Sequence, residues 1–132
     1  MELSKQSVLL IGGGEVAERK LDLLLKAKAK LTIISPKFTD YILELIKNNK
    51  NITAITSNYK SKHMDEIFSF VIAATNDESL NEEIASQANQ KGILVNVVDK
   101  PNICDFIFPS ILERGPITVA VIFLLFFINS RI

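Results

Sequence analysis

The chain has 132 residues, of which 48% are hydrophobic and 23% are charged. This composition predicts a globular domain with a core of its own and excludes an intrinsically disordered chain. Lysine and arginine together number 15, as do aspartate and glutamate, so the balanced charge argues against a nucleic-acid-binding surface.

Cysteine and histidine are too few for a disulfide framework or a metal cluster. Cys104 is the single cysteine and His63 the single histidine, so neither an internal disulfide nor a structural zinc site is predicted. A reducing, cytoplasmic setting fits this composition, and residues 1–6 lack the basic and then apolar order of a signal peptide. The apolar run from Val119 to Ile128 is shorter than the about 20 residues that a membrane span needs, so no membrane association is predicted.

The first predicted elements are a strand and a helix joined by glycines. The apolar, β-prone run Ser7–Ile11 predicts a strand, and three glycines follow it directly. A helix is expected over Glu15–Lys28, because its apolar residues recur at helical spacing. The inner face of this helix is expected to carry Ala17, Leu21, Leu24, Leu25 and the stem of Lys28.

The spacing Gly12-x-Gly14-x-x-Ala17 is the fingerprint of a dinucleotide-binding βαβ unit. Gly12 permits a tight turn out of the strand, Gly14 lets the backbone approach a pyrophosphate, and Ala17 lets the helix pack against the sheet. The helix N-terminus then offers N–H groups and the positive end of its dipole to phosphates. The alternative is a glycine-rich turn between strand and helix that binds nothing.

The rest of the chain continues the alternation of strands and helices. Strands are expected over Leu31–Ser35, Ile52–Thr56, Phe70–Ala74 and Leu94–Val98. Helices are expected over Thr39–Asn49, over Lys62–Phe68, and in a stretch opened by the capping-box sequence Ser79-x-x-Glu82 and closed by Gly92. This order predicts an α/β fold with a Rossmann-like, doubly wound and mainly parallel sheet. Short extra strands are expected at Phe106–Phe108 and Ile117–Val121.

Ligands of such sheets bind at the carboxyl ends of the strands, which directs attention to the loops there. The loop after the second strand holds Ser35, Pro36 and Lys37, where many dinucleotide folds carry an acidic residue for the ribose. Ser35 can bond a ribose hydroxyl, and Lys37 would tolerate a 2′-phosphate, so these residues leave NAD and NADP both open. The alternative is that Ser35 and Pro36 simply terminate the strand.

Two later strands also end in polar residues. Thr75 and Asn76, with Asp77 after them, can touch a cofactor or start the next helix. Asp99 follows an apolar strand, where a carboxylate facing a cofactor crevice can act as a general base, or it forms a turn. Asn96 can orient a ligand amide or satisfy the backbone.

The run Val8–Lys20, with its Ala-Glu-Arg-Lys continuation after the glycines, resembles the opening of the siroheme synthase N-terminal domain, the precorrin-2 dehydrogenase family. The resemblance extends over residues 3–121, almost the whole chain. The later stretches that agree in order and spacing are Ile72–Asp77, Val95–Asp99, Phe106–Ile111 and Gly115–Val121.

The resemblance implies an oxidoreductase of siroheme biosynthesis, which oxidises precorrin-2 to sirohydrochlorin with NAD. It leaves open a ferrochelatase activity, with a tetrapyrrole and Fe²⁺ as substrates. The family's essential aspartate falls on Asp99, and its NAD contacts on Glu15, Val16, Pro36 and Lys37, so NAD is favoured over NADP. With the residues that the pattern indicates, the predicted cofactor set is Gly12, Gly13, Gly14, Glu15, Val16, Ser35, Pro36, Lys37, Thr75 and Asn76.

The resemblance also predicts how the chain is divided. Residues 1–98 form the NAD-binding Rossmann domain, residues 99–121 begin the dimerisation and substrate region, and residues 122–132 are an unrelated apolar tail. The helical dimerisation region of the family homodimer is not in this sequence, so the chain is expected to be C-terminally truncated. A regulatory NAD-binding module and an inactive remnant of the enzyme stay as alternatives.

Overall fold

Strands and helices alternate along the chain, as the apolar pattern predicts. A computed structural model describes residues 6–99 and 104–108. The second extra strand, predicted at Ile117–Val121, and the predicted tail at 122–132 lie outside the described residues. The elements are β1 (Ser7–Ile11), α1 (Glu15–Lys26), β2 (Lys30–Ser35), α2 (Asp40–Asn48), β3 (Ile52–Thr56), the short 3₁₀ helix η1 (Ser61–Met64), β4 (Phe70–Ala73), α3 (Glu78–Gln90), β5 (Leu94–Asp99) and β6 (Cys104–Phe108).

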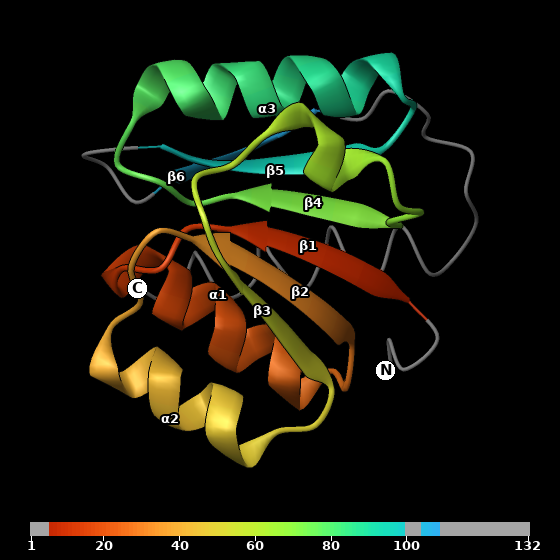
Figure 1. The fold of residues 1–132 in the computed structure, drawn as a ribbon. Coiled ribbons are helices and arrows are strands. Elements are labelled where there is room, and N and C mark those ends of the chain that lie inside the picture. The colour runs from red at the N-terminus through yellow and green to blue at the C-terminus, as the bar shows by residue number, and fades with distance from the viewer. Residues whose placement is uncertain (1–5, 100–103, 109–132) are drawn as a thin grey trace.

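The strands form one sheet in the order β3-β2-β1-β4-β5-β6 (Figure 1). The pairs from β3 to β5 are parallel, whereas β6 pairs antiparallel with β5, with Asp99 opposite Cys104. The predicted Rossmann-like α/β class is therefore confirmed, and β6 is the first of the extra strands. The chain runs outward from β1 to β3 and then returns to the other side of β1 with β4, so the strand order reverses beside β1.

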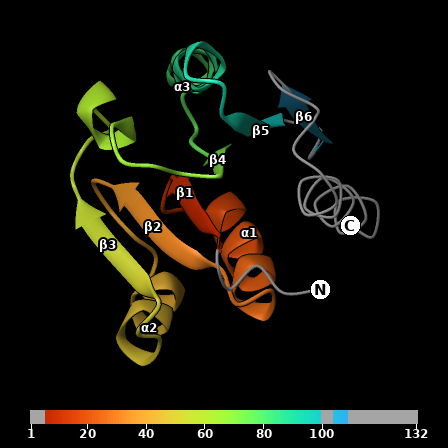
Figure 2. The same ribbon diagram turned by 90° about the vertical axis from the view of Figure 1, so that its right-hand side faces the viewer.

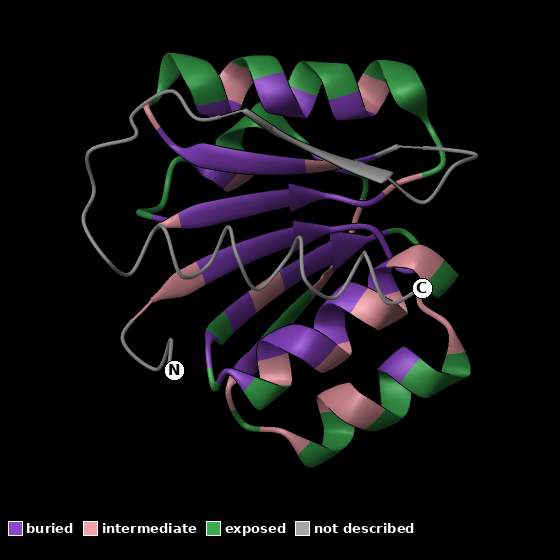
Figure 3. Cartoon of the chain, turned by 180° about the vertical axis from the view of Figure 1, so that it is seen from behind, coloured by how far each residue is buried: buried purple, intermediate pink, exposed green. Residues whose placement is uncertain are grey.

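Helices cover both faces of the sheet. Figures 1 and 2 show α1 and α2 on one face and α3 on the other, with η1 beside it. Side chains of a strand point alternately to the two faces, so Val8 and Leu10 of β1 pack under α1, whereas Leu9 and Ile11 pack toward α3. Because both faces are buried, β1 and β4 need apolar residues at nearly every position, and Figure 3 shows them buried throughout most of their length.

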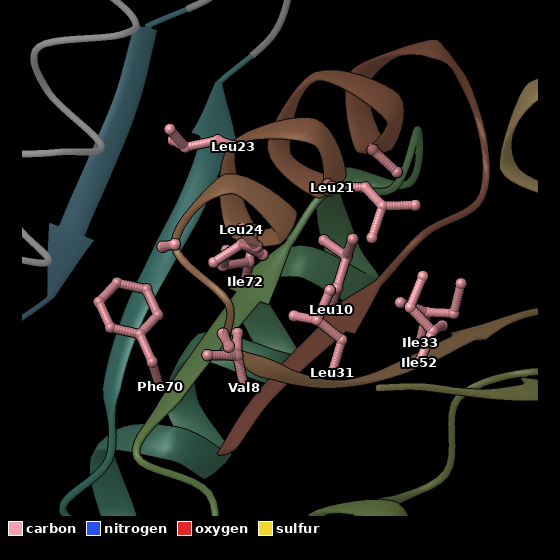
Figure 4. Close-up of a cluster of buried hydrophobic side chains, with 14 of the residues drawn as sticks. Val8, Leu10, Leu21, Leu23, Leu24, Leu31, Ile33, Ile52, Phe70 and Ile72 are labelled. Atoms are coloured by element: carbon pink, nitrogen blue, oxygen red, sulfur yellow. The ribbon is translucent and has the colours of Figure 1, made fainter. Parts of the chain in front are cut away.

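The larger cluster of buried side chains lies between the sheet and α1. Figure 4 shows Leu10, Leu31 and Ile72, from three neighbouring strands, facing Leu21 and Leu24 of the helix. Each of these five side chains is at most 2% exposed. This packing fixes α1 on the sheet, and with it the glycine turn at the helix N-terminus.

The helices differ from the predicted ones in three places. The helix predicted over Lys62–Phe68 is only the short 3₁₀ helix η1, which ends at Met64. Helix α1 ends at Lys26, and Lys28 lies beyond it, exposed and with a φ of 62°, so the prediction that its stem joins the inner face is wrong. Helix α3 is capped by Asp77, whose carboxylate accepts from the Leu80 N–H at 3.2 Å, and not by Ser79. Gly92, with a φ of 71°, follows α3 as predicted. None of the helices within the described ranges is long and apolar enough to cross a membrane.

Candidate functional site

A cleft opens at the carboxyl ends of β1, β2 and β4, where the strand order reverses. Its volume is about 850 Å³. All ten residues of the predicted cofactor set line this cleft, although they come from three separate segments of the chain. The structure therefore brings together residues that the sequence spreads from Gly12 to Asn76.

Gly12 carries the backbone out of β1 between two neighbouring strands. Its N–H donates to the Ile34 carbonyl of β2 at 2.9 Å, while the Ala74 N–H after β4 donates to the Ile11 carbonyl at 2.8 Å. Gly12 has a φ of 135°, and a Cβ atom there would collide with the Ala74 carbonyl oxygen. The tight turn predicted at Gly12 is therefore confirmed, and both its conformation and its lack of space require glycine.

Gly13 and Gly14 differ from each other in their surroundings. A Cβ atom on Gly13 would collide with the Lys37 carbonyl oxygen and lie 2.8 Å from the Ser35 hydroxyl, so Gly13 lets the β2–α2 loop close over the turn. A Cβ atom on Gly14 would meet no atom within 4 Å. Gly14 thus has open space beside it in the cleft, as expected of the position that a ligand approaches.

The N-terminus of α1 points its first turn at this open space. Gly14 is the N-cap residue, and no side-chain hydrogen bond caps the helix there. The N–H groups of a first helical turn lack acceptors within the helix, and they carry the positive end of its dipole. An anionic group in the cleft would supply the missing acceptors.

The loop after β2 is held by its own hydrogen bonds. The Ser35 hydroxyl donates to the Lys37 carbonyl at 2.6 Å, and the Thr39 N–H donates to the Gly13 carbonyl at 2.9 Å. Ser35 is 9% exposed, and its hydroxyl proton is engaged within the loop. These bonds favour the structural interpretation of the Ser35 side chain, while Pro36 and Lys37 are exposed at the rim of the cleft.

The sequence prediction missed the contribution of the segment after β3. Asn58 and Tyr59 also line the cleft, and the Tyr59 hydroxyl donates to the Gln87 side chain of α3. Burial, together with the negative charges of Glu83 and Asp65, raises the pKa of Tyr59 to about 12. The rule that ligands sit at the carboxyl ends of strands applies to β3 as well, and it points to this segment.

The other polar residues predicted to act in the site have different positions. Thr75 and Asn76 lie at the rim of the cleft after β4. Asn96 is buried within the sheet, paired in register with Ile72, so it lies in the body of β5 and not in the cleft. Asp99 is the last residue of β5. The role predicted for it depends on its side chain, which the structure does not describe, so that role stays a prediction.

Comparison with known proteins confirms the resemblance drawn from the sequence. Residues 1–110 match a protein family described as putative NAD(P)-binding. The siroheme synthase of Psychrobacter sp. (strain PRwf-1) is 44% identical over 120 residues, which are 91% of this chain and 24% of that protein. The siroheme synthase of Nitrosomonas europaea is 40% identical over 121 residues, 92% of this chain and 25% of that protein.

Among solved structures, a protein named SirC, precorrin-2 dehydrogenase, has the same fold. Its TM-score is 0.65 at 20% sequence identity, and the match covers 92% of this chain and 64% of that one. The chain spans about a quarter of the length of the siroheme synthases that it matches.

Alanine substitutions at Gly12 and Gly14 should differ in their effect on stability, because Gly12 is crowded and has a positive φ whereas Gly14 faces open space. We expect Gly12→Ala to lower the free energy of unfolding by about 2–4 kcal/mol, because the new Cβ has an unfavourable φ and meets Ala74. Gly14→Ala should lower it by less than about 1 kcal/mol, because no side-chain cap is lost and the new Cβ meets no atom within 4 Å. Urea unfolding followed by circular dichroism measures both, and equal losses would contradict this account of the turn.

The raised pKa of Tyr59 predicts a specific dependence of stability on pH. A neutral phenol is favoured in the folded chain, so this contribution is complete below the unfolded pKa of about 10 and is lost as pH rises toward about 12. Tyr59→Phe should cost about 0.5–1.5 kcal/mol near pH 8, because the bond to Gln87 is lost. Urea unfolding at a series of pH values measures the free energy of unfolding of both proteins. The difference between the wild type and the variant should shrink above pH 10, and a difference that stays constant would contradict the role given to Tyr59.

Proposed function

Because the chain belongs to the family described as putative NAD(P)-binding, we propose that its cleft binds NAD and that it forms the cofactor domain of a precorrin-2 dehydrogenase. The observation that carries this proposal is the open space beside Gly14, at a helix N-terminus that no side chain caps. The similarity to siroheme synthases and to a precorrin-2 dehydrogenase supports the substrate class.

The cleft suits a dinucleotide in size and in chemistry. Its volume of about 850 Å³ lies within the range typical of ligand pockets. We propose that the N–H groups of Glu15 and Val16, in the first turn of α1, bind the pyrophosphate where Gly14 leaves room for it. The remaining predicted cofactor residues then flank the two nucleoside halves from the loops after β2 and β4.

The loop after β2 bears on the choice between NAD and NADP. It offers no carboxylate for a ribose, and the Ser35 hydroxyl proton is engaged with the Lys37 carbonyl. We propose that the adenosine ribose instead meets the exposed edge formed by Pro36 and Lys37. NAD is the proposed cofactor because the family resemblance favours it.

The proposed reaction is the oxidation of a tetrapyrrole, precorrin-2, to sirohydrochlorin. When bound, NAD supplies the hydride acceptor, while the protein supplies orientation and proton transfer. We propose Asp99 as the general base that takes a proton from the substrate as it is oxidised, a role typically worth about 10²–10⁴-fold in rate.

We also propose a division of the chain into domains, a second activity and a cellular location. Residues 1–98 would form the cofactor domain and residues 99–121 the start of the substrate and dimerisation region of a family homodimer. Insertion of Fe²⁺ as a second activity is proposed with them. A cytoplasmic location is supported by the single cysteine, Cys104.

Cofactor binding can be tested separately from folding at Gly14. Gly14→Asp places an accepting carboxylate at an N-cap position, so the free energy of unfolding should stay equal or rise by a few tenths of a kcal/mol, on the order of 0.3. The same negative charge should weaken NADH binding by about 10-fold or more, since it repels the pyrophosphate. NADH fluorescence titration measures this affinity, with Gly14→Ala as the uncharged control.

If the wild-type chain fails to bind NADH, the proposed function is wrong. If Gly14→Asp binds NADH as tightly as the wild type, the cofactor lies elsewhere and the role of this helix end is wrong.

Asp99→Ala tests the proposed catalytic residue. We expect the rate of NAD⁺ reduction with freshly prepared precorrin-2 to fall by about 10²–10⁴-fold, while the affinity for NADH changes little, because a general base acts on the substrate. Absorbance at the NADH band follows the reaction. An equal loss of NADH affinity would contradict this role, and NADH binding by a wild-type chain without turnover would favour a regulatory module or an inactive remnant.

A further inference from the structure

Asn81 is a polar residue on the buried face of α3. Its neighbours along that face, Ile84, Ala85 and Ala88, are apolar and pack toward the sheet. Asn81 is nevertheless only 5% exposed. A buried amide is costly unless its donors and acceptor are satisfied, so its hydrogen bonds indicate what it does there.

The amide of Asn81 pairs with the backbone of Thr75, the second residue after β4. The Thr75 N–H donates to Asn81 Oδ1 at 3.3 Å, and Asn81 Nδ2 donates to the Thr75 carbonyl at 3.1 Å. The side chain therefore binds both backbone groups of one residue, as a neighbouring strand would. This pairing holds the chain in place at the point where β4 has ended.

Further bonds close the loop around this pair. The Thr75 hydroxyl lies 2.6 Å from Asn81 Oδ1 and 3.1 Å from the Asp77 carbonyl, and it accepts from the Asp77 N–H at 3.2 Å. The single hydroxyl proton is thus engaged within the loop. Thr75 lines the cleft, and its backbone groups are the ones that Asn81 binds.

The loop held by Asn81 continues into the glycine turn. Ala74, which precedes Thr75, bonds the end of β1 through its N–H, and its carbonyl oxygen occupies the space where a Cβ atom on Gly12 would lie. A shift of Thr75 would therefore move the surface against which Gly12 packs. Asn81 is thus connected to the cleft through Thr75 and Ala74, although it is not itself among the residues that line it.

We propose that Asn81 is a positioning residue that sets the affinity of the cleft for the nicotinamide half of the dinucleotide. This inference rests on the proposed function. A doubly wound sheet binds one mononucleotide on each side of the point where the strand order reverses. The adenosine half belongs on the side of β2, where the ribose-binding position of this fold lies, so the loop after β4 serves the other half.

The test compares NADH with ADP, which carries only the adenosine half and its phosphates. Asn81→Leu keeps the branched shape of the side chain, although leucine is larger, and leaves the Thr75 backbone groups without their partner. We expect its Kd for NADH to rise by about 10-fold or more, while its Kd for ADP stays within about twofold of the wild type. Titration calorimetry measures both ligands on the full chain.

Matched variants separate positioning from a general loss of stability. Asn89→Leu makes the same change at an exposed position of α3 and should leave both affinities unchanged. Ile84→Val weakens the core beneath the same helix and should lower the Tm without changing the Kd for NADH. Asn81→Ser, which keeps a small polar side chain, is measured alongside and should show the same selective loss if Asn81→Leu does not fold.

A folded Asn81 variant that binds NADH within twofold of the wild type overturns the inference, and so does an equal loss of NADH and ADP affinity. If the wild-type chain binds ADP but not NADH, or neither, the proposed function fails together with the inference. The inference is supported if the Asn81 variants lose affinity for NADH but not for ADP, while Asn89→Leu and Ile84→Val keep the wild-type affinities.

Discussion

The site depends on the passage of one residue, Gly12, between the ends of β2 and β4. Its N–H pairs with β2, and the space of its missing side chain is filled by the carbonyl of Ala74, the residue that follows β4. Because β2 and the end of β4 are fixed in the sheet, the glycine turn has little freedom to move. This turn also fixes the start of α1, so the helix N-terminus and the cleft are held in one arrangement.

The hydrophobic core holds this arrangement by packing both faces of the sheet. A strand covered on both faces has no polar face, which is why β1 is apolar from Val8 to Ile11. Leu21 and Leu24 bind α1 to one face and Ile84 binds α3 to the other. The stable part of the structure is therefore the sheet and its helices, and the loops at its carboxyl edge provide the polar groups.

In the part of the chain that the structure describes, the loops after β2 and β4 bond their polar groups within the protein, whereas the start of α1 is open. Ser35 bonds the Lys37 carbonyl, Thr39 caps α2, and Asn81 bonds the backbone of Thr75. The N-terminus of α1 has no such side-chain partner, and Gly14 beside it has open space. The contrast between closed loops and an open helix end is the physical reason for assigning an anionic ligand to this position.

Local patterns in the sequence were sufficient for the fold class, the glycine turn and the existence of every described strand, since apolar alternation, helical spacing and glycine spacing are properties of neighbouring residues. They also identified ten of the residues that line the cleft, because the carboxyl ends of parallel strands share one edge. Tertiary structure alone decided the roles of Gly13, Tyr59 and Asn81. Their partners are Lys37, Gln87 and Thr75, on other elements, and the bond between Tyr59 and Gln87 joins residues 28 positions apart. The contacts of Gly13 and Tyr59 exist only after the sheet has brought distant segments together, and that of Asn81 depends on how α3 packs after β4, so no periodicity in the chain predicts them.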